Sequence, residues 1–103
     1  MVKRKIVWTK SAISNRKQIL EYWFQRTSSI KFSKKLNDLF TERIKLLSEY
    51  PEIGRKTNES KVLVTPVKDY LIMYEFDTTE IIILLIWDTR RDESKIYKQT
   101  TQQ

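Results

Sequence analysis

The sequence predicts an α+β fold in which a short first strand and an antiparallel helical hairpin precede a β-sheet. Apolar residues recur with helical spacing from residue 12 to about residue 27, and from about residue 30 to residue 50. Stretches rich in β-branched and aromatic residues fill the second half of the chain, from residue 62 onward. A chain of 103 residues has room for one modest core, so residues 1–103 are expected to form a single domain.

The other elements are organised around residues 81–87, the most apolar run of the chain. Four of its seven residues are isoleucines, whose stiff side chains favour strands. An unbroken run cannot alternate between core and solvent, so it predicts a strand covered on both faces. A buried helix is the alternative, but the β-rich residues 70–76 and the short connection at residues 77–80 favour a strand. With residues 62–65, where Pro66 marks an edge or a bulge, these strands are expected to form a three-stranded antiparallel meander.

The first helix is expected to follow a short strand at residues 5–9, and Thr9 or Ser11 can serve as its N-cap. Its apolar face consists of Ala12, Ile19, Leu20 and Trp23. Ile13 and Phe24 lie at the margin of that face. The three consecutive aromatic residues from Tyr22 to Phe24 span too wide an arc for all to enter one core. One of them is therefore expected to be exposed or covered by a partner.

The second helix is expected after the turn at residues 27–29, and the short connection predicts that it packs antiparallel to the first. Its predicted apolar stripe consists of Phe32, Leu36, Leu39, Phe40, Leu47 and Tyr50. Pro51 ends this helix. Gly54, the only glycine, is expected to adopt a positive φ.

The chain is basic and lacks two residue types that carry much enzyme chemistry. It contains 20 Lys and Arg against 13 Asp and Glu, a net charge of +7. That charge predicts attraction to polyanions or acidic proteins, although a solvated basic surface explains it equally well. Cysteine and histidine are absent, which excludes disulfides, thiolate chemistry and the commonest metal ligand. We therefore expect no cofactor and no metal.

The chain shows no sign of membrane insertion or export. Its longest apolar run is far short of the roughly 20 residues of a membrane span. The apolar part of the basic N-terminus, residues 6–8, is too short for a secretory signal. We therefore expect a cytoplasmic protein without membrane contact, with a frayed tail at about residues 98–103.

Short motifs along nearly the whole chain, from residue 6 to about residue 96, match one family in order and spacing. They are Ile6-Val7-Trp8-Thr9 with Ala12, Ile19 with Tyr22, Leu47 with Tyr50-Pro51-Glu52-Ile53-Gly54, Asp69-Tyr70-Leu71-Ile72-Met73-Tyr74-Glu75, and Arg90-Arg91 after the closing strand. Together these residues resemble the RelE/ParE family of toxins from type II toxin–antitoxin (plasmid stabilisation) systems. The resemblance implies the same α+β fold.

The family that the chain resembles contains two activities. RelE-like members cut messenger RNA on the ribosome, using lysines on the second strand, arginines on the third strand and after the fourth, and a tyrosine near the C-terminus. Aligned with them, this chain has Val62 and Val64 at the lysine positions and Leu71 at one arginine position. As a nuclease, its candidate catalytic residues are Arg90, Tyr97 and Lys61, with Lys68 and Arg55 compensating from shifted positions.

The missing basic groups favour the second, ParE-like activity, because activating a 2′-hydroxyl and stabilising a phosphate require them. ParE-like members act on DNA gyrase, so the resemblance implies a gyrase poison rather than an enzyme. The implied target-facing residues are Arg90, Arg91, Lys95 and Tyr97. The alternative role for the charged ones is pairing with Asp88, Asp92 and Glu93. Tyr74 is expected to be a core residue rather than a catalytic one.

The resemblance also implies a partner, an antitoxin encoded beside the toxin, whose C-terminal segment wraps it. We expect that segment to be acidic and amphipathic, with its apolar side at the margin of the first helix. The expected antitoxin-binding residues are Tyr22, Phe24, Arg26, Arg55 and Lys56, with Arg16, Arg90 and Arg91 as further cations. A degenerate toxin that only binds its antitoxin and helps to repress their shared operon is a third interpretation.

Overall fold

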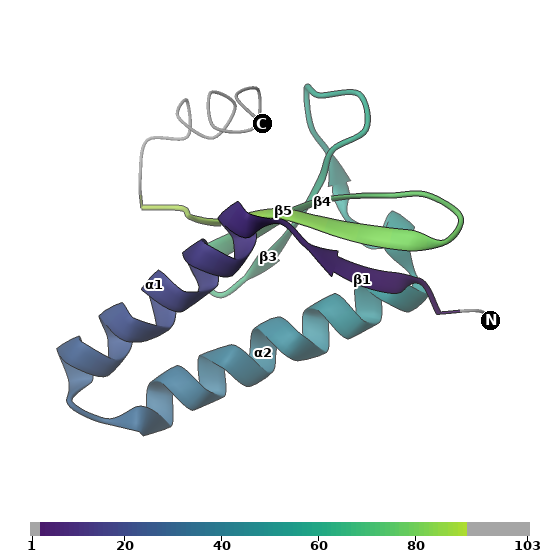
Figure 1. Cartoon of the computed structure of the whole chain (residues 1–103). Helices are drawn as coiled ribbons and strands as arrows, with labels where there is room; N and C mark the ends of the chain where they lie inside the picture. Colours follow the sequence, from purple (N-terminus) through teal and green to yellow (C-terminus); the bar gives the residue numbers. More distant parts are fainter. Residues whose placement is uncertain (1–2, 91–103) are drawn as a thin grey trace.

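The computed structural model describes residues 3–90, and its main elements follow the predicted order (Figure 1). They are β1 (Lys5–Trp8), α1 (Lys10–Thr27), α2 (Ile30–Glu49), the 3-10 turn η1 (Pro51–Ile53), β2 (Arg55–Lys56), β3 (Leu63–Val67), β4 (Tyr70–Phe76) and β5 (Glu80–Asp88). The predicted α+β class is confirmed. The tail expected at residues 98–103 lies outside the described residues.

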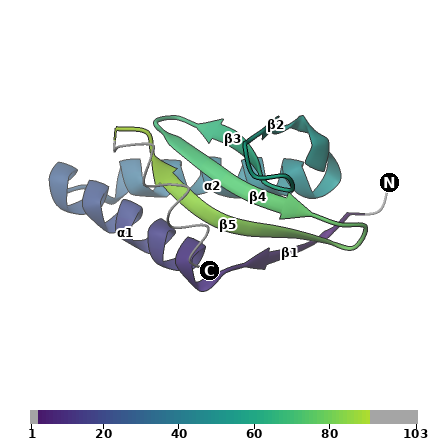
Figure 2. The same ribbon diagram turned by 90° about the horizontal axis from the view of Figure 1, so that it is seen from above.

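The strands form one five-stranded sheet in the order β1-β5-β4-β3-β2 (Figure 2). β3, β4 and β5 pair antiparallel, which confirms the predicted meander. β1 lies parallel to β5, with Ile6 opposite Ile81. Pro66 lies in β3 beyond the end of β2, at an edge as predicted. The sequence prediction missed β2, because its two residues are too few to show an alternating pattern.

Both faces of β5 are buried, as its apolar run predicted. Ile81 and Ile83 face the two helices within the main core, whereas Leu85 and Trp87 belong to a second cluster on the opposite face. An irregularity in the pairing with β4 leaves Leu84 as an extra residue, so the alternation of side chains changes phase inside the strand. Both helices lie on the main-core face of the sheet (Figure 1).

Side-chain caps fix where the two helices begin. Of the two candidate caps of α1, the structure uses Thr9, whose Oγ1 accepts from the Ala12 N–H at 3.1 Å. The same hydroxyl donates to the Leu84 carbonyl at 2.8 Å, which ties the start of α1 to β5. Between the helices Ser28 has a left-handed φ of 53°, and Ser29 then caps α2. The connection is therefore as short as predicted.

Two of the three consecutive aromatic side chains are exposed, where the sequence predicted one. Trp23 packs against the main core, and its ring centre lies 4.8 Å from that of Phe32. Tyr22 and Phe24 keep 43% and 50% of their surface exposed. They are two residues apart, about 200° around the helix, so they occupy opposite flanks. The reason is that α1 buries only a narrow face, in which Ala12 is the one fully buried residue of the helix.

The buried stripe of α2 differs from the prediction at its ends. Leu36, Phe40 and Leu47 are buried as expected, and Ile44, which the prediction omitted, is buried with them. Phe32 and Tyr50 were expected in the stripe but keep 38% and 45% of their surface exposed. Phe32 lies beside the buried Ser33, on the flank of the helix, and Tyr50 follows the end of α2.

Gly54 is required for space rather than for a positive φ. Its φ is −72°, so the predicted left-handed conformation is wrong. A Cβ at this position would lie 2.1 Å from Tyr74 Oη. That hydroxyl accepts from the Gly54 N–H at 2.9 Å and donates to the Pro51 carbonyl at 2.7 Å. Tyr74 is fully buried and burial raises its pKa, so it has the core role expected from the sequence.

Candidate functional site

An arginine that follows β5 contacts two aromatic rings of α1. Arg90 Nε and Nη2 donate to the Asp88 carboxylate at 2.9 and 2.7 Å, in a two-bond arrangement. Arg90 Cζ lies 5.9 Å from the ring centre of Tyr22 and 5.6 Å from that of Trp23. Both distances are within the range of cation–π interactions. We call Arg90, Asp88, Tyr22, Trp23 and Tyr70 the Arg90 cluster.

Tyr70 joins the Arg90 cluster to the main core. Its Oη accepts from Trp23 Nε1 at 2.7 Å, and its ring centre lies 5.8 Å from that of Phe40. Burial raises the pKa of Tyr70, while the Trp23 hydrogen bond lowers it by less. The hydrogen bond to Asp88 raises the pKa of Arg90 above its ordinary value. The cluster therefore places the charged Arg90–Asp88 pair against aromatic side chains. Of these, Tyr70 belongs to the main core and Trp23 packs against it.

A hollow of about 410 Å³ opens beside the cluster, between α1 and the adjoining ends of β4 and β5. Its walls include Asn15, Gln18 and Tyr22 from α1, Tyr70 and Asp88 from the sheet, and Arg90, which follows β5. The sequence analysis missed Asn15 and Gln18, because polar residues on a helix flank look like solvated positions. Asn15 Oδ1 accepts from the Ile86 N–H at 3.2 Å, which holds this flank of α1 against β5.

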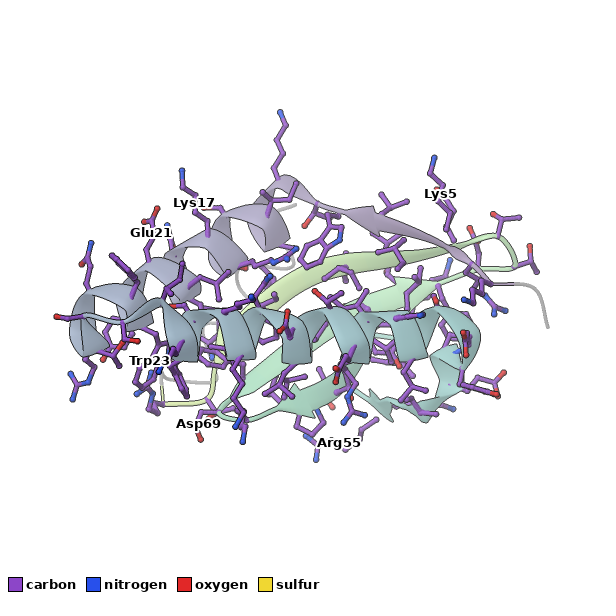
Figure 3. The ribbon with its side chains drawn as sticks, turned by 90° about the horizontal axis from the view of Figure 1, so that it is seen from below. Lys5, Lys17, Glu21, Trp23, Arg55 and Asp69 are labelled. Atoms are coloured by element: carbon purple, nitrogen blue, oxygen red, sulfur yellow. The ribbon has the colours of Figure 1, made fainter. Side chains whose placement is uncertain are left out.

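The structure separates the residues that were predicted to bind the antitoxin. Arg26 lies beside the Arg90 cluster, since its Cζ is 6.0 Å from the ring centre of Tyr22, which belongs to that cluster. Phe24 lies on the other flank of α1. Arg55 and Lys56 form β2 at the far edge of the sheet, and Figure 3 shows Arg55 across α2 from α1. The five residues therefore do not lie on one local surface beside Tyr22.

The predicted target-facing residues are only partly described. Arg90 lies in the cluster, and its pairing with Asp88, the alternative role suggested by the sequence, is present. Arg91, Lys95 and Tyr97 lie outside the described residues. Arg16, named as a further cation, donates to Asn37 Oδ1 through Nε at 2.7 Å and lies over the Trp8 ring. Arg16 is therefore occupied by α2 and β1.

The positions that a RelE-like nuclease fills with basic residues are hydrophobic and packed. Val62 and Val64 are buried in the second cluster, on the sheet face opposite the helices, and Leu71 packs against them. Of the proposed substitutes, Lys61 is exposed, and Lys68 lies in the β3–β4 turn with a φ of 55°. This face of the sheet is a hydrophobic layer where the nuclease would need cations.

The Arg90 cluster offers a paired cation, two aromatic faces and neighbouring amide groups, a set suited to contact with another macromolecule.

Within residues 3–90, no group of three or more Asp, Glu, His and Cys side chains is placed to hold a metal ion. In the same part of the chain, no helix is long and apolar enough to cross a bilayer.

Fold and site together define a class: a small α+β protein with a helical hairpin on one face of a mixed sheet and an arginine–aromatic cluster where the hairpin meets β5. The chain belongs to the family described as ParE toxin of type II toxin-antitoxin system, parDE, which matches residues 6–93. The predicted resemblance to RelE/ParE toxins is thereby confirmed.

Comparison with solved structures supports the same fold. Nine chains match, and one of them is described as the chromosomal ParDE TA system from P. aeruginosa. That structure has a TM-score of 0.72 at 18% sequence identity, and the alignment covers 84% of this chain and 96% of that chain. An identity this low establishes a shared fold. No curated protein matches this chain significantly.

Proposed function

We propose that this protein is the toxin of a type II toxin–antitoxin pair, that it poisons DNA gyrase, and that a cognate antitoxin neutralises it. The observation that favours gyrase over messenger RNA is the hydrophobic layer that contains Val62, Val64 and Leu71. A nuclease of the RelE type needs basic groups at these positions to deprotonate a 2′-hydroxyl and to stabilise the phosphate. Apolar side chains supply neither function.

The state of Arg90 supports a role in binding rather than in catalysis. A catalytic arginine gives its donors to a phosphate, but two donors of Arg90 already bind Asp88. A docking arginine can keep this pair and present its remaining donors and flat face to a partner. We therefore place Arg90 on the target-facing surface, together with Arg91, Lys95 and Tyr97, which follow it in the chain.

The antitoxin is proposed to dock on the flank of α1 that carries Tyr22. Two arginines contact this half-exposed ring, with Arg26 Cζ at 6.0 Å and Arg90 Cζ at 5.9 Å from its centre. An acidic amphipathic segment can cover the ring and place carboxylates on both guanidinium groups. Because Arg90 belongs to both proposed surfaces, a bound antitoxin would cover part of the target-facing surface. Neutralisation then follows from occlusion.

Tyr22→Ala is expected to speed dissociation of the antitoxin, with a loss of about 1–3 kcal/mol if the ring is buried in the complex. Phe24→Ala removes a similar ring from the opposite flank of α1 and is the matched control, with a smaller expected effect. The measurement is the binding kinetics of purified toxin with the antitoxin encoded beside its gene. An unchanged dissociation rate for Tyr22→Ala would place the antitoxin elsewhere.

Induced expression tests whether the protein is an active toxin. We expect growth arrest when the chain is expressed alone, and rescue when the neighbouring antitoxin gene is expressed with it. Growth that continues despite soluble expression, with antitoxin binding intact, would instead identify a degenerate toxin that serves only as a binding module. Absence of both arrest and binding would overturn the proposed function.

A further inference from the structure

The turn end of the helical hairpin, residues 22–37, carries a concentrated positive charge. Between Glu21 and Asp38 the sequence contains four cationic residues and no acidic one. Three of the four, Lys31, Lys34 and Lys35, lie in the first two turns of α2. All three side chains are exposed, and no ion pair joins them to an acidic group within residues 3–90. We call these three residues the hairpin-tip lysines.

The hairpin-tip lysines reverse the usual distribution of charge along a helix. The helix dipole favours acidic residues in the first turn and basic residues in the last. The first turn of α2 has no acidic residue, its last turn has no basic one, and the helix ends at Glu49. Positions where a sequence departs from such a local rule are often functional. The reversed pattern therefore favours a role for these lysines in binding.

The hairpin tip projects from the molecule, and contacts between the two helices hold it in place. Figure 1 shows the turn between α1 and α2 extending beyond the sheet. Trp23 packs against Phe32 across the hairpin, with ring centres 4.8 Å apart. Ser33 Oγ donates to the Leu20 carbonyl at 2.8 Å. The lysines are thus carried on a defined projection rather than on a loop.

The hairpin-tip lysines face away from the core with a spacing that suits a row of phosphates. Around the helix axis, each of them lies at least about 120° from the buried Phe40. Lys31 and Lys35 are four residues apart, about 6 Å along the axis. Phosphates on one strand of duplex DNA follow one another about every 3.4 Å along the duplex, so about three of them span a similar length.

The hairpin tip adjoins the proposed target-facing surface. Arg26, the fourth cation of the tip, contacts the ring of Tyr22, and the same ring contacts Arg90. Figure 2 shows the end of β5 and the hairpin turn at the same end of the molecule. A protein that docks on gyrase through Arg90 therefore presents the hairpin-tip lysines beside that contact. Gyrase works on bound DNA, which is a denser row of negative charge than a protein surface offers.

We propose that the hairpin-tip lysines contact the phosphate backbone of the DNA that gyrase holds, so that the toxin binds the enzyme and its DNA together. The inference rests on the proposed function for the identity of the DNA-bound target. The contact is independent of base sequence, because bonds to phosphate position a protein on DNA and carry no sequence information directly. It also makes part of the binding dependent on salt.

The direct test is one triple variant that combines Lys31→Gln, Lys34→Gln and Lys35→Gln. The matched control makes the same change at three other exposed lysines, on β1 and in the first half of α1: Lys5, Lys10 and Lys17 (Figure 3). Each variant loses three positive charges, so only the position of the lost charge differs. Because the hairpin-tip lysines oppose the helix dipole, their removal should not lower the melting temperature. Circular dichroism on heating checks that both variants are folded.

Fluorescence anisotropy with a labelled DNA duplex, measured across a range of salt concentrations, counts the phosphates that the toxin contacts. The logarithm of the binding constant falls against the logarithm of the salt concentration by about 0.9 for each phosphate. Loss of the hairpin-tip lysines is expected to reduce this slope by about 2–3, and the control by less than about 1. The hairpin-tip variant should also need at least about tenfold more toxin to inhibit gyrase, because it loses the same phosphate contacts.

The outcomes separate this inference from the proposed function. If the wild type does not inhibit gyrase, the proposed function fails, while the salt slopes still decide whether the hairpin-tip lysines contact DNA. If the wild type inhibits gyrase and the two triple variants have equal slopes and equal potency, the inference is wrong. A hairpin-tip variant that loses inhibition but keeps the wild-type slope would assign these lysines to an acidic surface of the enzyme, which also overturns the DNA contact.

Discussion

Ile83→Asp is expected to unfold the protein. Ile83 is fully buried in β5, which lies between β1 and β4, and its side chain packs in the main core beneath the helices. A carboxylate buried there without a partner costs several kcal/mol. That cost is comparable with the total stability of a small domain, about 5–15 kcal/mol. Circular dichroism on heating should show that the cooperative transition of the wild type is lost.

Leu85→Asp and Ile6→Asp complete this test. Leu85 is equally buried but belongs to the cluster on the opposite sheet face, so its substitution is also expected to unfold the chain. Ile6 lies in the edge strand β1 and is 37% exposed, so the same chemical change should be tolerated far better. A soluble Ile83→Asp variant that melts near the wild-type temperature would contradict the central position of β5.

Gly54→Ala is expected to destabilise the protein through a steric clash with a buried tyrosine. The new Cβ would meet Tyr74 Oη at 2.1 Å and Tyr74 Cζ at 2.8 Å, and the tyrosine is fully buried. The ring cannot withdraw without losing its hydrogen bonds to Pro51 and Gly54. Overpacking of this kind costs about 1–3 kcal/mol, and occasionally more. Urea unfolding of the variant against wild type measures the loss.

A double-mutant cycle assigns that loss to its cause. The Tyr74→Phe substitution removes Tyr74 Oη, the atom that would lie nearest to the new Cβ at position 54, and with it two hydrogen bonds. If the clash is the cause, Gly54→Ala should cost less in the Tyr74→Phe background than in the wild type. Equal costs in the two backgrounds would show that the contact with Tyr74 Oη is not the cause of the loss.

Local patterns predicted most of the fold because they depend on neighbours in the sequence. The periods of the helices, the apolar run of β5 and the Thr9 cap are all visible in short stretches. The strand β2 was missed because its two residues are too few to show a pattern. The role of Gly54 was missed because Tyr74, the residue that requires a glycine there, is twenty residues away in the sequence. The positive φ predicted for Gly54 was wrong for the same reason.

The candidate site was harder to predict, because its residues come from distant parts of the chain. From the sequence, Tyr22 was assigned to an antitoxin surface, and Arg90 to a target surface and, as a further cation, to the antitoxin surface. The structure brings the two residues into one cluster. Tyr70 supports that cluster through Trp23, across 47 residues of sequence, and no local pattern reveals the contact. Conversely, Arg55 was grouped with Tyr22 by charge alone, but the fold puts it on β2 at the far sheet edge.

The measurement that tests the central claim most directly is the state of plasmid DNA after incubation with purified gyrase, ATP and this protein. We expect supercoiling to be inhibited and cleaved DNA to remain linked to gyrase, while ribosome-bound messenger RNA stays intact. Arg90→Ala is expected to lose most of this effect, and Lys17→Ala, which removes one exposed charge from α1 outside the cluster, to retain it. Unimpaired supercoiling, together with codon-dependent cuts in messenger RNA that vanish in Arg90→Ala, would contradict the account and establish the nuclease.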